Sequence, residues 1–371
     1  MKIIFKIIFV ILVVILSISG IVYSLYGGGE RWIYTSPASI LGESKLEIVA
    51  SLPFPPGNIA LNFEDRIFIT IHPESKPVDF KVVEIVDGKY QAFPDEISQT
   101  TLYSHPQGIR VDSKDRVCTI DHGDNGIKPA RFVCVSIESK KVEIDYTFPR
   151  EVAPLLSYLQ DFVPDSESRF YYFADVNFFG KNPGLVVYDS KENRSRRILE
   201  DHYSTSPENW KIFAYNGPME RLGGLIVLKA GVDSIAIDRN DEWLYYAPMN
   251  HRKMFRILID KISDLNFSNQ DLEKFVEVYS DKILSDGILM DDEGNIFLTD
   301  VEHQSIARIT TDRKLENWIS SSKFRWPDGL ALGKGNFMYV ADSDIPNIAL
   351  QSQDHIKASA PYYLFRFPYK R

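Results

Sequence analysis

A chain of 371 residues with 44% hydrophobic and 13% aromatic residues has the composition of a folded globular protein, which excludes a disordered or collagen-like chain. The formal net charge of -9 argues against a nucleic-acid partner, because phosphate contacts need clustered Lys and Arg. A net negative charge is better suited to a cation or a neutral organic molecule as the ligand.

The N-terminus carries an apolar segment of transmembrane length. Lys2 and Lys6 precede an uncharged run, residues 7–25, that is long enough to cross a hydrocarbon core. The two lysines favour a cytoplasmic N-terminus, so the remaining chain is expected to be extracellular, secreted or periplasmic. We expect residues 1–26 to form a signal anchor or a signal peptide, and residues 27–44 a linker. Contact with a membrane is expected only through this N-terminal segment.

One type of segment recurs six times in the rest of the chain. The clearest copy is LSDGILMDDEGNIFLTD from Leu284, and WPDGLALGKGNFMYVAD from Trp326 repeats it almost position by position. Each copy has a polar opening residue, an apolar strand, a turn and a second apolar strand. The intervals of about 40 to 72 residues fit one four-stranded propeller blade per copy.

The sequence therefore predicts an all-β protein, with a six-bladed β-propeller over residues 45–371 preceded by the N-terminal hydrophobic helix. The last copy reaches the end of the chain after its third strand. Leu46–Ala50 is predicted to provide the missing outer strand and so close the ring. Two stacked β-sandwiches are the competing arrangement, but they do not explain six hairpins in register.

Two cysteines are too few for a disulfide-rich scaffold, and they lack the C-x-x-C spacing of a zinc or redox site. Cys118 and Cys134 are predicted to lie on neighbouring strands. They pair if the compartment is oxidising, or they pack as small apolar residues, and the sequence leaves both alternatives open.

The opening residues of the six copies are predicted to ring one mouth of the central channel, because the innermost strands all begin at the same face. These residues are Asn58, Gln107, Asp161, Asp233, Asp286 and Asp328. Aspartates that end the second strands are expected just outside this ring, at positions 121, 175, 300 and 342. His122, His251 and His303 are expected on the loops over the mouth.

Carboxylates that face one another across a narrow channel raise one another's pKa values, and a bound hard cation would relieve the repulsion. A purely structural role stays open as the alternative at each position. Each opening residue then caps its own hairpin, and the following Gly only gives the backbone freedom.

Two strings carry a family resemblance: GVDSIAIDRNDEWLYYAPM from Gly231 and LSDGILMDDEGNIFLTDVEHQSI from Leu284. They resemble the major royal jelly protein/yellow family, over about Leu46 to Phe367. This resemblance implies an exported propeller with a small-molecule site in the channel mouth. Some members of that family bind biogenic amines, and others are linked to dopachrome conversion. More distantly, the Asp-Gly hairpins resemble the gluconolactonase/senescence marker protein superfamily, which implies a divalent cation, usually calcium, and lactone or ester hydrolysis.

The distant resemblance also implies roles for individual residues. Asp286 matches the aspartate that binds the metal and acts as the catalytic base, in the context SDGILMDDEGNIFLTD. Asn58 stands where that superfamily has a Glu, and Asp233 replaces an Asn, so the implied metal ligands are Asn58, Asp233 and Asp286 for Ca²⁺ or another divalent cation. The residues then expected to contact a small-molecule ligand are Gln107, Asp161, Asp328, His122, His251 and His303.

Three functions therefore remain open from the sequence. The ring binds a small organic ligand, such as an amine or a catechol, with or without a divalent cation. Alternatively the protein is a metal-dependent lactone or ester hydrolase with Asp286 as base, or a dopachrome-conversion-like isomerase. In the third case the propeller is an interaction scaffold without chemistry.

Overall fold

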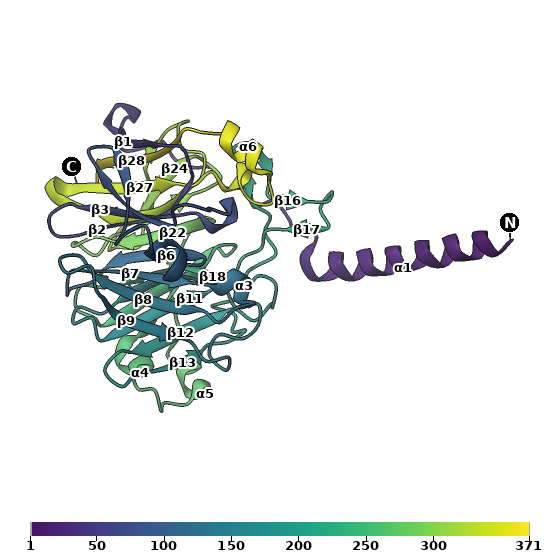
Figure 1. Cartoon of the computed structure of the whole chain (residues 1–371), viewed down its shortest axis with the longest axis horizontal. Helices are drawn as coiled ribbons and strands as arrows, with labels where there is room; N and C mark the ends of the chain where they lie inside the picture. The colour runs from purple at the N-terminus through teal and green to yellow at the C-terminus, as the bar shows by residue number, and fades with distance from the viewer. Residues whose placement is uncertain (1, 371) are drawn as a thin grey trace.

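The six repeated segments fold into six four-stranded antiparallel sheets arranged in a ring around a central channel. The computed structural model describes residues 2–370, and Figure 1 shows it from the side with α1 projecting from the propeller. Blade 1 consists of β2 (Pro56–Leu61), β3 (Ile67–Ile71), β4 (Val82–Val86) and β5 (Lys89–Ala92). Blade 2 consists of β6 (Pro106–Val111), β7 (Arg116–Asp121), β8 (Arg131–Ser136) and β9 (Val142–Thr147). Blade 3 consists of β10 (Leu159–Pro164), β11 (Phe170–Asp175), β12 (Gly184–Asp189) and β13 (Arg194–Ile198).

The remaining blades follow the same order. Blade 4 consists of β18 (Val232–Ile237), β19 (Trp243–Pro248), β20 (Lys253–Leu258) and β21 (Glu277–Asp281). Blade 5 consists of β22 (Ser285–Met290), β23 (Ile296–Asp300), β24 (Ser305–Ile309) and β25 (Leu315–Ser320). Blade 6 consists of β26 (Pro327–Leu332), β27 (Phe337–Asp342), β28 (Tyr362–Pro368) and β1 (Glu47–Leu52).

Strand β1 closes the ring as the outer strand of the last blade. It pairs antiparallel with β28, with Glu47 opposite Arg366 and Leu52 opposite Tyr362. This pairing confirms the closure predicted from Leu46–Ala50. It also joins the start of the propeller to its end and covers the outward edge of β28, which would otherwise be unpaired.

The segments that connect the strands contain short helices and two small hairpins. The helices are α2 (Ser98–Thr101), α3 (Gly123–Gly126), α4 (Ile259–Ser263), α5 (Asn269–Leu272) and α6 (Gln353–Ala358). The hairpins are β14 (Phe213–Ala214) with β15 (Gly217–Pro218), and β16 (Glu220–Arg221) with β17 (Ile226–Val227). Both hairpins belong to the long insertion between blades 3 and 4.

The predicted N-terminal helix is α1 (Lys2–Tyr26), and none of its residues is buried. By length and composition it is able to cross a membrane, as a signal sequence or an anchor would. The linker that follows lies along the propeller. Glu30 forms a parallel bridge with Trp210, and Leu41 forms one with Ile319.

We call the face on which the first strand of each blade begins and the second strand ends the mouth face. At this face every innermost strand has a β-bulge at the same point, between residues 56 and 59, 106 and 109, 159 and 161, 232 and 234, 285 and 288, and 327 and 330. A bulge leaves residues outside the ladder and redirects their side chains. The same register therefore presents one position of each blade to the channel mouth.

This register corrects part of the predicted ring. Aligned on the bulge, the residues at the mouth position are Gly57, Gln107, Gln160, Asp233, Asp286 and Asp328. Asn58 and Asp161 lie one residue further along their strands, where other blades have Gly108, Ser234, Gly287 and Gly329. The sequence alignment misplaced these two because it matched polar residues, whereas the bulge sets the position.

The glycines at this second position are required by close packing between blades. None of them has a positive φ. A Cβ on Gly108 would lie 2.6 Å from the carbonyl oxygen of Gln160 in the next blade, and Cβ atoms on Gly287 and Gly329 would collide with Asp328 O and Asn58 Oδ1. The alternative that these glycines only give freedom to the turn is therefore wrong.

We expect Gly287→Ala to lower the free energy of unfolding by about 1–3 kcal/mol, because the neighbouring carbonyl belongs to a packed strand and has no room to move. Gly42→Ala is the matched control, since Cβ there meets nothing nearer than Ser44 Oγ at 3.8 Å and φ is -70°. Urea unfolding of both variants measures the difference. Equal stability of the two variants would contradict the packing argument.

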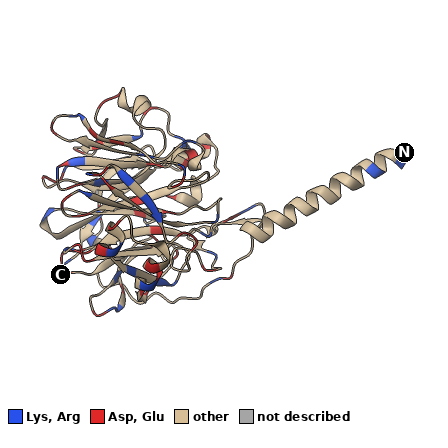
Figure 2. Ribbon diagram, turned by 90° about the horizontal axis from the view of Figure 1, so that it is seen from below, with Lys and Arg blue, Asp and Glu red and all other residues tan. Residues whose placement is uncertain are grey.

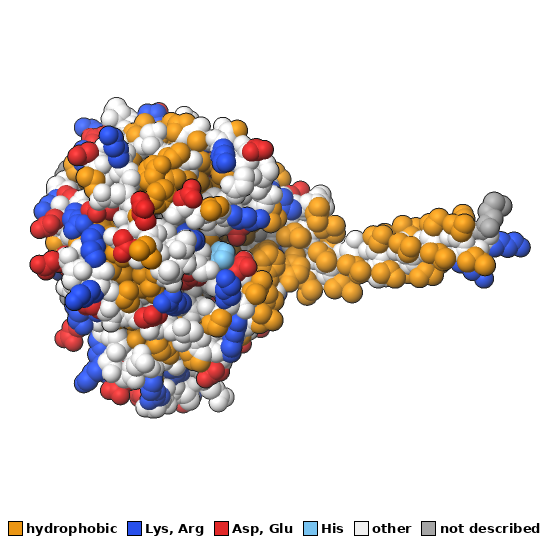
Figure 3. All heavy atoms as spheres, viewed as in Figure 1, with side chains coloured by type: hydrophobic (Ala, Val, Ile, Leu, Met, Phe, Trp, Pro, Cys, Tyr) orange, Lys and Arg blue, Asp and Glu red, His pale blue; other side chains and the backbone are white. Residues whose placement is uncertain are grey.

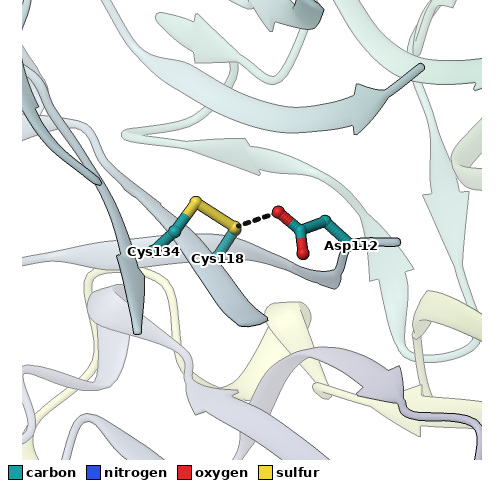
Figure 4. A group of neighbouring side chains, drawn as sticks. All are labelled: Asp112, Cys118 and Cys134. Atoms are coloured by element: carbon teal, nitrogen blue, oxygen red, sulfur yellow. Dashed lines mark hydrogen bonds between the residues drawn. A yellow bond between two sulfur atoms is a disulfide. The ribbon is translucent and has the colours of Figure 1, made fainter. Parts of the chain in front are cut away.

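The two cysteines form a disulfide between β7 and β8, where Cys118 lies directly opposite Cys134 (Figure 4). This resolves the alternative left open by the sequence. Asp112 Oδ2 lies 3.5 Å from Cys118 Sγ and accepts hydrogen bonds from Arg116 and Tyr171. Because both sulfurs are bonded to each other, this cluster has no thiolate to offer a metal.

Candidate functional site

A cavity of about 230 Å³ opens over the mouth of the channel. Its polar residues include His72, Gln160, Asp233 and Asp286, which lie at or beside the bulged ends of the innermost strands. The rest of the wall is mostly apolar and includes Val176, Phe178, Phe179, Met219, Ile226, Leu228, Met249, Trp326 and Leu350. Such a cavity fits a small molecule with an apolar body and one polar end.

The insertion between blades 3 and 4 provides much of this apolar wall. Met219, Ile226 and Leu228 come from it, and Phe178 and Phe179 come from the loop between β11 and β12. The insertion accounts for the interval of 72 residues between Asp161 and Asp233 in the sequence. A repeat search skips such a segment, so the sequence analysis missed it.

Asp233 is a buried carboxyl in the cavity wall that lacks hydrogen-bond partners for one of its oxygens. Its side chain is buried, and Oδ2 has no hydrogen-bond partner among the described residues. Burial raises the pKa of Asp233 well above its usual value, and the neighbouring carboxyls of Asp286 and Asp328 raise it further. A buried polar atom without a partner costs free energy unless a ligand or water satisfies it.

Asp286 lies beside Asp233 and has two donors. Its Oδ2 accepts a hydrogen bond of 2.6 Å from the indole Nε1 of Trp326, and Oδ1 accepts one of 3.4 Å from Gln160 Nε2. Burial raises the pKa of Asp286 to about 7 despite the hydrogen bond from Trp326. The carboxyl is therefore in balance between its neutral and charged forms near neutral pH.

Asp328 and His72 form the third side of the mouth. His72 Nε2 lies 3.8 Å from Asp328 Oδ2. Burial lowers the pKa of His72 to about 3, so the ring is neutral at pH 7 and this contact is not an ion pair. Burial and the charge of Asp286 raise the pKa of Asp328 well above its usual value.

Beneath the mouth, Arg110 pairs with the two residues that the register moves inward. Its Nη2 lies 2.5 Å from Asp161 Oδ2, and Nη1 donates a hydrogen bond of 3.2 Å to Asn58 Oδ1. Asn58 Oδ1 also accepts a hydrogen bond of 2.8 Å from the backbone N–H of Ile59. The guanidinium thus provides a positive charge inside the channel. Sequence reasoning missed it because Arg110 stands in a strand pattern with no sign of its partners in the two adjacent blades.

Gln107 and His122 are also at the mouth. The side-chain Oε1 of Gln107 has no partner among residues 2–370. His122 is buried, its Nδ1 accepts a hydrogen bond from the Asn125 N–H, and its ring stacks on Tyr158 with centroids 4.0 Å apart. Tyr158 lines the cavity, so His122 supports the wall from behind.

The other two histidines lie away from the cavity. His303 Nδ1 is 2.9 Å from Asp300 Oδ1, and its Nε2 is 3.2 Å from the carbonyl oxygen of Tyr34. His251 Nδ1 accepts a hydrogen bond from the Lys253 N–H. Neither ring belongs to the residues that line the cavity, so the predicted ligand contacts of His251 and His303 have no counterpart in its wall.

The aspartates that end the second strands fix the loops of the mouth face. Asp121 accepts hydrogen bonds from the N–H groups of Ser104 and His105, and Asp342 accepts them from Arg325 and Trp326. Asp175 does the same for Tyr158. These bonds place Trp326 and Tyr158 in the wall, so these aspartates position the pocket without lining it.

Lys282 is a further group that the sequence analysis missed. It is fully buried, and its Nζ donates hydrogen bonds to Ile283 O at 2.8 Å and Ser285 Oγ at 3.1 Å. Burial lowers the pKa of Lys282 to about 7, while the charge of Asp233 raises it. Its partners are neutral oxygens, so Lys282 only partly compensates the carboxylates.

The donor set at the mouth fits a divalent cation in part. Asp233 and Asp286 offer carboxylate oxygens, and Asp233 Oδ2 is unpartnered among the described residues. Asn58 Oδ1 is already bonded to Ile59 and Arg110. Among residues 2–370, His, Cys, Asp and Glu side chains bring three ligand atoms within 4.8 Å of one another only at Asp112, Cys118 and Cys134. One oxygen from each of Asp233, Asp286 and Asp328 therefore cannot be chosen so that all three lie within that distance of one another.

Comparison with solved structures shows which known proteins share this fold. The chain aligns with a gluconolactonase from Xanthomonas campestris at a TM-score of 0.54 and 11% identity, covering 87% of this chain and 88% of that one. It aligns with the calcium-binding protein regucalcin from Agrobacterium tumefaciens at a TM-score of 0.55 and 11% identity, covering 89% and 95%. A luciferin-regenerating enzyme gives a TM-score of 0.53 at 11% identity, covering 87% and 94%. At this level of identity the likeness shows a shared propeller fold alone.

Comparison with curated protein sequences finds no match. A family model described as Major royal jelly protein matches residues 106–352, which is more than half of the chain. The matched range includes blades 2 to 5 and the first two strands of blade 6, with the insertion that forms the wall of the cavity. The chain therefore belongs to the major royal jelly protein family.

Proposed function

We propose that this protein binds a small organic amine in the cavity at the channel mouth, with the ammonium group on Asp233 and Asp286. The observation that carries the proposal is the buried, unpartnered Oδ2 of Asp233 at one end of an apolar cavity. An ammonium group donates three hydrogen bonds and carries the charge that this end of the cavity lacks.

The surroundings favour an organic cation over a bare divalent ion. A hard divalent cation such as Ca²⁺ prefers an all-oxygen shell, whereas Phe178, Met219 and Leu228 add apolar surface to the same cavity as the carboxyls. The inner carboxylate, Asp161, is already paired with Arg110. An apolar amine uses both the wall and the remaining charge.

A matched pair of ligands tests this proposal. We expect 2-phenylethylamine to raise the thermal unfolding temperature of the full chain, because a ligand that binds only the folded state stabilises it. The neutral analogue 2-phenylethanol has a similar shape and is expected to have little effect. Equal shifts from the two compounds, or no shift from either, would count against an amine site.

The pKa of Asp286 gives the binding a pH dependence. Below pH 7 this carboxyl is largely protonated and has no charge to pair with, and above pH 7 it is largely ionised. The ligand amine, with a pKa near the lysine value of about 10.4, stays charged over this range. We expect the affinity to rise about tenfold from pH 6 to pH 8, measured by calorimetry. An affinity independent of pH would mean that Asp286 does not contact the amine.

Hydrolysis of a lactone or ester is the second candidate. Asp286 faces the cavity with a pKa of about 7, which suits a general base at neutral pH. Asp233 and Asp286 would hold a divalent cation, which when bound polarises a carbonyl group and lowers the pKa of water. Asp286 would accept a proton while Trp326 keeps it oriented through its 2.6 Å hydrogen bond. Lactone hydrolysis that is lost with a chelator and in Asp286→Asn would support this candidate, and activity indifferent to both would remove it.

A further inference from the structure

The N-terminal helix ends at the rim of the cavity. Tyr26 is the last residue of α1, and its hydroxyl donates a hydrogen bond of 2.8 Å to the carbonyl oxygen of Phe179. Its ring lies 5.8 Å from that of Phe178, and Lys181 Nζ is 4.4 Å from the centroids of both rings. Phe178 and Phe179 line the cavity. The same aromatic cluster therefore joins the end of α1 to the rim.

The chain stays attached to the propeller immediately after the helix. Lys229 Nζ donates a hydrogen bond of 2.7 Å to the carbonyl oxygen of Gly27. Glu30 N donates to Asn209 O at 3.0 Å, and Glu30 O accepts from Lys211 N at 2.8 Å. No free linker separates α1 from the mouth face, so the medium around the end of α1 is also within reach of the cavity rim.

Helix α1 requires an apolar medium. It has 25 residues, which gives a length of about 37 Å, enough to cross a hydrocarbon core of about 30 Å. None of its residues is buried, and Lys2 and Lys6 at its start are its charged residues (Figure 2). An apolar helix with no protein cover is stable in lipid and not in water.

The mouth face itself exposes large apolar side chains. They come from loops that connect second to third strands or one blade to the next, and include Ile97, Ile127, Leu155, Phe179, Leu222 and Leu350. Leu222 and Leu350 are 73% and 71% exposed. In the described connections of the opposite face only Phe63 is comparably exposed. Figure 3 shows hydrophobic side chains gathered around the base of α1, and Figure 1 shows α3, α6 and the β16–β17 hairpin on that side.

We propose that α1 is a transmembrane anchor and that the mouth face lies on the surface of the lipid bilayer, with Leu222 and Leu350 in contact with lipid. Tyr26 and Lys181 then lie at the interface, where aromatic rings and lysine side chains are favoured. The cavity opens toward the membrane surface instead of toward bulk solvent. Lipid is the occupant that the structure favours for this face, because α1 has no buried residue and ends at the rim of the cavity.

Lipid quenching tests the proposal on the full chain reconstituted in phosphatidylcholine nanodiscs. The described residues contain no free cysteine, so Leu222→Cys, Leu350→Cys and the opposite-face control Phe63→Cys can each be labelled with one environment-sensitive fluorophore. We expect nitroxide-labelled lipid to quench the Leu222 and Leu350 labels at least twofold more than the Phe63 label.

Equal quenching at the three positions would overturn the proposal. A blue-shifted label at Leu222 or Leu350 without lipid quenching would also overturn it, because protein would then cover the face. An intact mass that shows cleavage near Gly27 would remove the anchor. Amine binding is measured separately on the unlabelled parent chain in nanodiscs of the same composition, because Leu350 lines the cavity. Loss of docking with retained binding contradicts this inference alone, and the reverse contradicts the proposed function alone.

Discussion

Arg110→Met is expected to lower the free energy of unfolding by about 3–5 kcal/mol, the range found when one partner of a buried ion pair is removed. Arg110 lies 2.5 Å from Asp161, and the two side chains are only 12% and 7% exposed. Without the guanidinium, Asp161 is a buried charge next to Asp233, Asp286 and Asp328, whose pKa values are already raised. Equilibrium unfolding in urea measures the loss.

The control for this variant is Arg366→Met. Arg366 pairs with the largely exposed Glu47 on the outer strands of blade 6, and such pairs contribute about 0–1 kcal/mol. Adding Asp161→Asn to Arg110→Met should restore most of the lost stability, because the uncompensated charge is then gone. An effect of Arg110→Met no larger than that of Arg366→Met would show that the channel does not need this cation.

Asp233→Asn is expected to weaken the binding of 2-phenylethylamine by about 10- to 100-fold, since a hydrogen bond to a charged group contributes about 1.5–3 kcal/mol. The variant keeps the shape of the side chain and removes its charge. It should fold at least as well as the parent protein at pH 8, because Asp233 Oδ2 has no hydrogen-bond partner to lose and repulsion from Asp286 is relieved.

Asp281→Asn is the matched control for charge. Asp281 is at the end of an outer strand, its side chain is 77% exposed, and it pairs with Lys253. Both variants replace an aspartate with the amide of the same shape, so a loss of binding in Asp233→Asn alone assigns the effect to the position of Asp233 at the cavity. Calorimetric titration of the two variants measures the difference. If both bind the amine as the parent protein does, the ammonium group does not lie on Asp233.

Much of the fold could be predicted from the sequence because the repeat is local. Alternating apolar residues and Asp-Gly turns identify each hairpin, and the chain's lack of a last strand points to Leu46–Ala50. The structure confirms both, and the family resemblance is confirmed by the match over residues 106–352. Each of these features depends on short-range patterns.

The site was harder to predict because it depends on register and on contacts between blades. Asp161 looks like an opening residue in LQDFVPD, but the bulge presents Gln160 to the mouth instead. A one-residue change in register moves a side chain to another level of the channel. Arg110 and His72 carry no repeat signal, and the wall from Met219 and Leu228 comes from an insertion outside the repeat.

The pairing of Cys118 with Cys134 also combines a feature that the local sequence predicts with one that depends on register. The sequence placed both on neighbouring strands but left their state open. Their exact opposition across β7 and β8 decides it, and that register is known only from the fold.

A crystal structure of the full chain with 2-phenylethylamine tests the central claim most directly. We expect the ammonium nitrogen within hydrogen-bond distance of Asp233 Oδ2, with the ring against Phe178 and Leu228. An amine bound elsewhere, or a metal ion coordinated by Asp233 and Asp286 in place of the ammonium group, would contradict it.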